Sequence, residues 1–429
     1  MTVKQFQLSD MLISEHQVSV PLDWRDPQHS PCINVFYREV VSVERAAQKL
    51  PLLLFLQGGP GGKSPRPQSG HPCWLPQALE TYRVILLDQR GTGQSSRIDA
   101  SLIAHKTAEQ GRDYLLNFRA DSIIKDCEYI RKTCYHSQQF YTLGQSYGGF
   151  LTLSYLSYAP QALAGCFVTG GLAGIDATAE QVYQLTYPLV AEKTELFYQQ
   201  YPDTRVRLAQ IGECLANEAV YLPDGERLTA ERFQSLGILL GTGSGMQTLY
   251  YLVDEAFAGH AKQALSDTFL AQVMMLANYW DNPLYAVMQE SIYGQGQQAT
   301  NWAAQRVRDQ LGGFKGNPES LPLTGEMIYP WMFEQIGYLK PFAPAANALA
   351  AYNDYSYLYD LECLGRNEVL VVAAVYANDM YVPRTLSERT AQLTANLHTW
   401  VTDKFEHDGV RQSTEVFEHL TTMMHELSH

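Results

Sequence analysis

The sequence predicts an α/β protein with a doubly wound, mostly parallel sheet and an inserted helical cap domain. Three observations predict it. Short apolar runs alternate with helical patterns up to about residue 175. Residues 178–354 lack strand patterns and read as tyrosine-rich helices, too long for a loop. Alternation then returns, so we expect the sheet domain at 1–175 and 356–429 and the cap at 176–355.

Composition narrows the class of protein. The 429 residues are 46% hydrophobic, as in a globular chain with a large core. The formal net charge of −14 argues against a nucleic-acid or anionic-membrane partner. Residues 1–10 lack the pattern of a signal peptide, and no run reaches the ~18 apolar residues of a membrane span. Seven scattered cysteines without a Cys-x-x-Cys pair favour reduced thiols, so we expect a cytoplasmic protein.

The N-terminal part begins with an expected hairpin. Residues 18–24 and 32–43 alternate apolar and polar side chains around a turn-rich segment, which predicts antiparallel strands at the edge of a sheet. Residues 50–56 are continuously apolar, as in a strand buried on both faces, and residues 83–87 predict the next such strand. An amphipathic helix follows at residues 121–134.

A serine lies in a sharp predicted turn. Residues 144–149, Gly-Gln-Ser-Tyr-Gly-Gly, follow an apolar strand at 139–143 and precede a helix at 150–158. A Gly-x-Ser-x-Gly between a strand and a helix is the nucleophile elbow of the α/β-hydrolase fold. The helix dipole at this position favours negative charge near the serine hydroxyl. We therefore expect an α/β-hydrolase fold with Ser146 as the nucleophile.

The rest of the chain contains further strand and helix patterns. A glycine-rich run at residues 241–245, Gly-Thr-Gly-Ser-Gly, lacks the βαβ context of a nucleotide loop and predicts a bend between helices. The remaining predicted elements are strands at residues 164–168, 369–375 and 397–402 and helices at residues 180–201, 246–257 and 414–427.

The serine needs a base, and the base needs an acid. In this fold the order along the chain is serine, acid, histidine, and both late residues follow strand ends. Asp379 follows one late strand and His407 follows the next, whereas His398 lies inside a strand. The predicted catalytic residues are therefore Ser146, Asp379 and His407. The histidines of the terminal helix or tail fit less well: His419, His425 and His429.

Two backbone N–H groups are expected to form an oxyanion hole. One belongs to Tyr147, the residue after the nucleophile. The other comes from the glycine-rich loop 57–62, Gln-Gly-Gly-Pro-Gly-Gly, with Gly59 as the expected donor and Gly58 as the alternative. No metal-ligand spacing of histidine, cysteine or carboxylate accompanies these residues, so we expect acyl transfer without a metal or cofactor.

Several stretches together resemble the prolyl aminopeptidase (proline iminopeptidase) family, serine aminopeptidases of the α/β-hydrolase fold. The long cap resembles that of the larger bacterial members, and the resemblance covers nearly the whole chain. Gln57 departs from the histidine of the smaller relatives, which leaves the backbone donor intact. The stretches are residues 58–62, 88–95 (Asp-Gln-Arg-Gly-Thr-Gly-Gln-Ser, the most specific), 144–149, 301–304 and 325–331.

The resemblance implies that N-terminal proline is released from peptides, so the expected partners are peptides with a free N-terminal proline. In the family, a glutamate of a Glu-Asn-His-Tyr-type helix holds the substrate amine. Glu290, in Glu-Ser-Ile-Tyr, matches this loosely, and Glu255 and Glu326 are further candidates. Aromatic cap residues and Tyr147 would wall a small apolar pocket for the proline ring.

Two alternative functions stay open at this point. The first is a serine hydrolase of the same fold that acts on esters or on other N-terminal residues. The second is a binding protein of this fold that has lost catalysis. A panel of aminoacyl chromogenic substrates separates the first from a prolyl aminopeptidase, and labelling of Ser146 by an active-serine probe tests the second.

Overall fold

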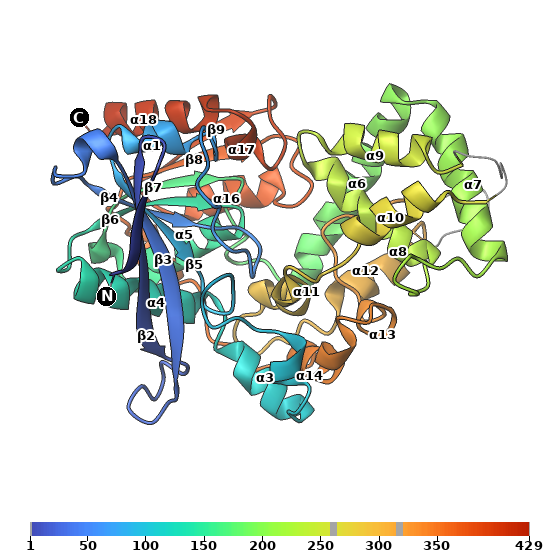
Figure 1. Ribbon diagram of the computed structural model, residues 1–429, viewed down its shortest axis with the longest axis horizontal. Coiled ribbons are helices and arrows are strands. Elements are labelled where there is room, and N and C mark those ends of the chain that lie inside the picture. Colours follow the sequence, from blue (N-terminus) through green and yellow to red (C-terminus); the bar gives the residue numbers. More distant parts are fainter. Residues whose placement is uncertain (1, 258–263, 315–320, 429) are drawn as a thin grey trace.

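A nine-stranded sheet forms the centre of the sheet domain (Figure 1). The computed structural model describes residues 2–257, 264–314 and 321–428. The strand order is β1-β2-β3-β5-β4-β6-β7-β8-β9. Strands β1, β2, β3 and β5 pair antiparallel, and the pairings from β5 to β9 are parallel. The predicted mostly parallel sheet is therefore confirmed.

Most strands agree with the predicted runs, and two differ. The N-terminal strand was not predicted, and the strand expected at residues 18–24 lies at residues 11–21. The expected hairpin is formed by β2 and β3. It does not form the edge of the sheet, because residues near the N-terminus add one more strand, which pairs with the outer side of β2. In that edge strand Lys4, Gln5, Gln7 and Leu8 are exposed, so its sequence lacks the apolar alternation that predicts a half-buried strand. The strands are β1 (Thr2–Leu8), β2 (Met11–Pro21), β3 (Cys32–Ser42), β4 (Leu52–Leu56), β5 (Arg83–Asp88), β6 (Phe140–Gln145), β7 (Leu163–Thr169), β8 (Val371–Tyr376) and β9 (Leu397–Thr402).

Helices cover both faces of the sheet. Phe55 of β4 stacks on Trp74 beside α1, and Trp74 in turn contacts Phe417 of α18. Leu54 and Leu56 belong to the opposite core, together with α4 and α5. This is why β4 is continuously apolar. The helices of the sheet domain are α1 (Leu75–Leu79), α2 (Ala100–Ile103), α3 (Ala108–Leu116), α4 (Ala120–Cys134), α5 (Tyr147–Tyr158), α15 (Leu361–Gly365), α16 (Arg384–Leu393), α17 (Gly409–Gln412) and α18 (Glu415–Leu427), with the 3-10 helices η1 (Val43–Arg45) and η2 (Pro160–Ala162).

Helices fill the chain between β7 and β8 and lie beside the sheet domain in Figure 1. The described part of this region holds no strand beyond isolated bridges. Its helices are α6 (Ala179–Gln200), α7 (Asp203–Asn217), α8 (Ala230–Gln234), α9 (Gly245–Asp254), α10 (Asp267–Leu276), α11 (Pro283–Met288), α12 (Ala303–Leu311), α13 (Met332–Gln335) and α14 (Ala343–Ala350), with the 3-10 helices η3 (Ser235–Gly241), η4 (Glu290–Tyr293) and η5 (Lys340–Phe342).

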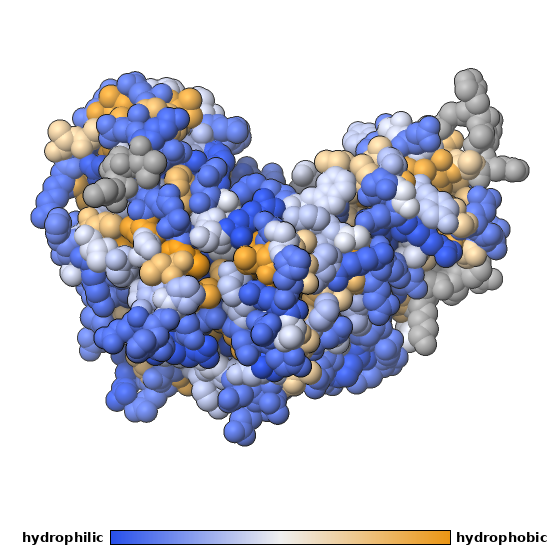
Figure 2. Space-filling model, turned by 60° about the horizontal axis from the view of Figure 1, so that its bottom comes forward, coloured by the Kyte–Doolittle hydropathy of each residue, from blue (hydrophilic) through white to orange (hydrophobic). Residues whose placement is uncertain are grey.

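The cap also packs on an early part of the chain. Helix α14 lies against α3, where a Cβ atom on Gly111 would be 2.6 Å from Cβ of Ala345. The exact domain bounds stay a prediction. Figure 2 shows a mostly hydrophilic surface, hollowed between the sheet lobe and the cap lobe. Among the described helices, none combines the length and the apolar character that crossing a membrane requires.

Candidate active site

Ser146 lies at the sharp turn between β6 and α5. Its backbone has φ 57° and ψ −125°, a conformation that is uncommon for a residue other than glycine. A Cβ atom on Gly148 would lie 1.8 Å from the carbonyl oxygen of Leu56, and one on Gly144 would lie 2.4 Å from the carbonyl oxygen of Gly148. Glycine is therefore required on both sides of the serine by close backbone approach.

Asp379 and His407 meet after the ends of β8 and β9. Nδ1 of His407 lies 2.7 Å from Oδ2 of Asp379, and both side chains are buried. The other carboxylate oxygen of Asp379 accepts the backbone N–H groups of Tyr381 and Val382 at 2.8 and 3.0 Å. Burial lowers the pKa of His407, but the charge of Asp379 and its hydrogen bond outweigh burial, so this pKa lies above its usual value.

Two glycines that follow β7 pack between Ser146 and His407. A Cβ atom on Gly170 would lie 3.2 Å from Nδ1 of His407, and one on Gly171 would lie 2.4 Å from the backbone oxygen of Ser146. The structure thus brings the loops of Ser146, Asp379 and His407 together. His398 instead lies within β9, and two other late histidines lie on α18: His419, which stacks on Trp400, and His425. His429 lies outside the described residues.

The loop 57–62 passes directly beside Ser146. A Cβ atom on Gly58 would lie 3.0 Å from Cβ of Ser146. Gly59 has φ 136°, which L side chains rarely adopt, and Tyr147 begins α5. Gly58 and Tyr147 therefore flank Ser146, and Gly59 is the next residue of the same loop, so the choice of Gly59 or Gly58 as the second oxyanion donor stays a prediction.

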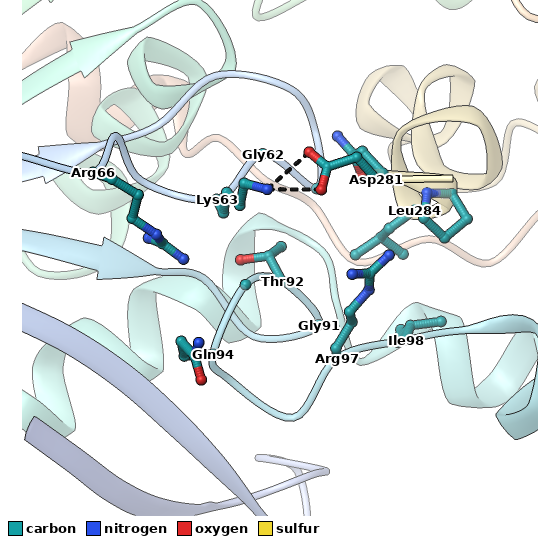
Figure 3. Close-up of a pocket in the computed structure, with 14 residues that line it drawn as sticks. Gly62, Lys63, Arg66, Gly91, Thr92, Gln94, Arg97, Ile98, Asp281 and Leu284 are labelled. Atoms are coloured by element: carbon teal, nitrogen blue, oxygen red, sulfur yellow. Dashed lines mark hydrogen bonds and ion pairs between the residues drawn. The ribbon is translucent and has the colours of Figure 1, made fainter. Parts of the chain in front are cut away.

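Asp88, in the stretch 88–95, contacts the residues that follow this loop. Asp88 accepts the backbone N–H of Ser64 at 3.1 Å and pairs with both terminal nitrogens of Arg66. Figure 3 shows the neighbouring pocket of about 490 Å³, where Lys63 donates to Asp281 of the cap at 2.7 and 2.9 Å. Asp88 thus holds the segment after the glycine loop to the sheet domain, and Lys63 of that segment pairs with the cap.

Glu326 interacts electrostatically with the Asp379–His407 pair. Oη of Tyr285, on α11, donates to Oε1 of Glu326 at 3.0 Å. The pKa of Glu326 is raised to about 7, because burial and the charge of Asp379 outweigh the lowering effects of His407 and Tyr285. Because Asp379 and His407 both shift its pKa, the Glu326 carboxyl group lies within electrostatic reach of both residues. Tyr285 was not singled out in the sequence, because no local pattern marks it.

Glu290 is buried in the cap and already has one partner. Its Oε2 accepts the backbone N–H of Ala304 at 3.1 Å, in the first turn of α12, where helix N–H groups lack internal partners. Its Oε1 has no hydrogen-bond partner within the described residues. Burial raises the pKa of Glu290, while the nearby polar groups of Thr300, Ala304 and Ala303 lower it.

Two buried tyrosines interact electrostatically with both of these carboxylates. Beyond the effect of burial, Glu290 and Glu326 each raise the pKa of Tyr183 and of Tyr293. The two rings meet edge to face with centroids 6.0 Å apart. Glu255 is different: it is exposed after α9, and its carboxylate accepts from the side-chain amide of Gln272 at 2.5 Å. Glu290 and Glu326 therefore both lie within electrostatic reach of the same two buried tyrosines, whereas Glu255 belongs to the cap surface.

Comparison with known proteins gives the family. A family model described as alpha/beta hydrolase fold matches residues 51–256. The chain is 42% identical to the proline iminopeptidase of Aeromonas sobria over 401 residues, which is 93% of each chain. It is 34% identical to the proline iminopeptidase aneH of Aspergillus aculeatus over 407 residues, covering 92% of this chain and 90% of the relative.

A shorter match is found with the proline iminopeptidase of Saccharolobus solfataricus, 28% identical over 156 residues, 36% of this chain and 42% of that relative. The two long matches include the cap, since they span nine-tenths of the sequence. The chain therefore belongs to the proline iminopeptidase family of enzymes, with the α/β-hydrolase fold.

Proposed function

We propose that the chain is a serine aminopeptidase that releases N-terminal proline from peptides through an acyl-enzyme on Ser146. The observation that carries this activity is the 42% identity to the Aeromonas sobria proline iminopeptidase across 93% of both chains. The hydrogen bond between His407 and Asp379 beside the nucleophile elbow supports the chemistry.

The acylation step uses the three side chains as one unit. With Nδ1–H of His407 donating to Asp379, the lone pair on Nε2 is left to accept the proton of Ser146 Oγ. Oγ then attacks the prolyl carbonyl carbon, and the carbonyl oxygen becomes an oxyanion. The N–H groups of Tyr147 and Gly59 stabilise this oxyanion. His407 gives its proton to the leaving nitrogen as the peptide bond breaks.

Deacylation repeats these steps with water. His407 takes a proton from water, the hydroxyl attacks the prolyl ester, and a second oxyanion occupies the same hole. Collapse breaks the ester bond, returns the proton to Ser146 Oγ and releases free proline. Water is therefore the only co-reactant that the two half-reactions consume.

Glu326 and Glu290 together would bind the substrate amine. The nitrogen of an N-terminal proline is a secondary ammonium with two N–H donors, which cannot be buried without acceptors. Glu326 is close to His407, and Glu290 has an unpaired buried oxygen. An arriving cation lowers the pKa of Glu326 and holds it ionised. Glu255, exposed and bonded to Gln272, is not part of this proposed site.

We also propose a cytoplasmic location, because the seven cysteines are scattered along the chain and form no Cys-x-x-Cys pair. Cell fractionation with an antibody to the chain tests it. Recovery of the chain in a secreted or membrane fraction would contradict the proposal.

The activity is tested by kinetics on proline-naphthylamide, alanine-naphthylamide and N-acetylproline-naphthylamide. We expect the highest kcat/KM on the first, because the long-matching relatives are proline iminopeptidases and the proposed carboxylates need a free amine. Equal rates on the alanine substrate would favour a broader aminopeptidase. Comparable cleavage of the acetylated substrate would show that no amine is bound and would overturn the proposal.

A further inference from the structure

One cap segment, residues 238–243, lies directly on the loop that carries His407. The backbone N–H of His407 donates to the carbonyl oxygen of Gly241 at 3.1 Å. The backbone N–H of Gly243 donates to Oδ1 of Asp408 at 2.8 Å. Oδ2 of Asp408 accepts from Gln412 of α17 at 2.7 Å, so both oxygens of this carboxylate are engaged. The cap is thus hydrogen-bonded to the histidine itself and to the residue after it.

Tyr381 joins the same cap segment to both members of the catalytic pair. Its ring lies edge-on to the His407 imidazole, with centroids 4.7 Å apart and an interplanar angle of 79°. Its backbone N–H donates to Oδ1 of Asp379 at 2.8 Å, and its hydroxyl donates to the carbonyl oxygen of Ile238. The side chain is buried. One residue therefore touches the acid, the base and the cap.

Gly241 allows the cap to approach this ring. A Cβ atom on Gly241 would lie 2.3 Å from Cζ and 2.6 Å from Oη of Tyr381, which no real side chain tolerates. The φ angle of Gly241 is outside the left-handed region, so the backbone there does not demand glycine. The glycine is needed because the tyrosine ring occupies the space where a side chain would project.

We propose that Tyr381, clamped by residues 238–243 of the cap, is a positioning residue that holds the His407 imidazole in line with Ser146. The hydrogen bond to Asp379 is a single contact about which an imidazole can rock. The edge of the Tyr381 ring blocks that motion on one side, and the bond from His407 N–H to Gly241 holds the backbone. Misplacement by about 1 Å can cost roughly 100-fold in rate. This role rests on the proposed function of His407 as the base.

Gly241→Ala is the direct test, because the added methyl group must displace the Tyr381 ring. We expect kcat on proline-naphthylamide to fall about 10- to 100-fold with KM changed less than about threefold. We expect the rate at which a small neutral organophosphonate labels Ser146 to fall by a similar factor, since labelling needs the base but no amine site. The final extent of labelling reports how much protein is folded. Ser244→Ala, at an exposed position of the same loop, is the matched control and should behave as wild type.

A double variant separates displacement of the ring from damage to the cap. Tyr381→Ala removes the ring and makes room for the methyl group, so Gly241→Ala/Tyr381→Ala should be no slower than Tyr381→Ala alone. Tyr381→Phe keeps the ring and loses only the bond to Ile238, so it should retain more of kcat and of the labelling rate than Tyr381→Ala.

Two results would overturn the positioning role. One is a Gly241→Ala enzyme with a wild-type labelling rate and a loss confined to KM, because the cap would then act on substrate binding. The other is additive losses in the double variant. A wild-type protein that is labelled at Ser146 but leaves proline substrates intact would instead refute the proposed function, and the labelling series would still test the clamp.

Discussion

Nδ1 of His407 is hydrogen-bonded to Oδ2 of Asp379 at 2.7 Å, although 28 residues separate them in the chain. The bond is buried, and the second oxygen of Asp379 is already held by two backbone N–H groups. The carboxylate therefore has a fixed direction, and it determines which ring nitrogen of His407 faces it. Nε2 is left as the basic nitrogen, which makes the following predictions specific.

Ser146→Ala and His407→Ala should each lower kcat/KM on proline-naphthylamide by roughly three to six orders of magnitude while the protein stays folded, because the members of such a set act as a unit. His398→Ala is the control, since this side chain lies within β9. Circular dichroism checks folding. Near-wild-type activity in His407→Ala, with loss in His398→Ala, would mean that the base is misassigned.

The acid limb of the pH profile should be steeper than a single ionisation allows. Proton transfer needs neutral His407, whose pKa Asp379 raises against the lowering effect of burial. Amine binding needs ionised Glu326, whose pKa burial raises to about 7. Both requirements fail as pH falls, so log kcat/KM should approach a slope of about two below pH 6. A slope of one throughout would contradict a required ionisation of Glu326.

Glu326→Gln and Glu290→Gln should each lower kcat/KM for proline substrates about ten- to several-hundred-fold, as for a lost charge-assisted hydrogen bond of ~1.5–3 kcal/mol. Labelling of Ser146 by a neutral organophosphonate at pH 8 should change little, since the probe has no amine. Glu255→Gln is the matched control, because that carboxylate is exposed. Equal losses in both assays would assign the glutamate a structural role instead.

Asp126→Asn should destabilise the fold strongly. Arg90 of the 88–95 stretch is fully buried and donates to both oxygens of Asp126 at 2.6 Å, as well as to the carbonyl oxygens of Pro21, Leu22 and Asn117. Removing the carboxylate charge leaves the buried guanidinium without an opposite charge, at a cost of about 3–5 kcal/mol.

Urea unfolding measures that cost. Glu388→Gln, which breaks an exposed pair with Arg384, should change the free energy of unfolding by no more than about 1 kcal/mol. A similar small change for Asp126→Asn would show that the Arg90 pair contributes little to stability.

The sequence by itself determined the fold and the order of the candidate catalytic residues. Buried strands such as β4 and β8 are continuously apolar, and the glycines around Ser146 are dictated by backbone contacts within a few residues. Asp379 and His407 could be chosen because the ends of parallel strands meet at one edge of the sheet. These are local signals, or signals that the topology of the sheet turns into proximity.

The tertiary structure alone decided which cap residues meet this edge. Glu255, Glu290 and Glu326 look alike as isolated acidic residues, and their burial depends on how cap helices far apart in sequence pack. Only packing places Glu290 where its carboxylate accepts a backbone N–H in the first turn of α12. Only packing sets Gly241 against Tyr381, because that contact joins segments 140 residues apart whose local patterns carry no information about each other.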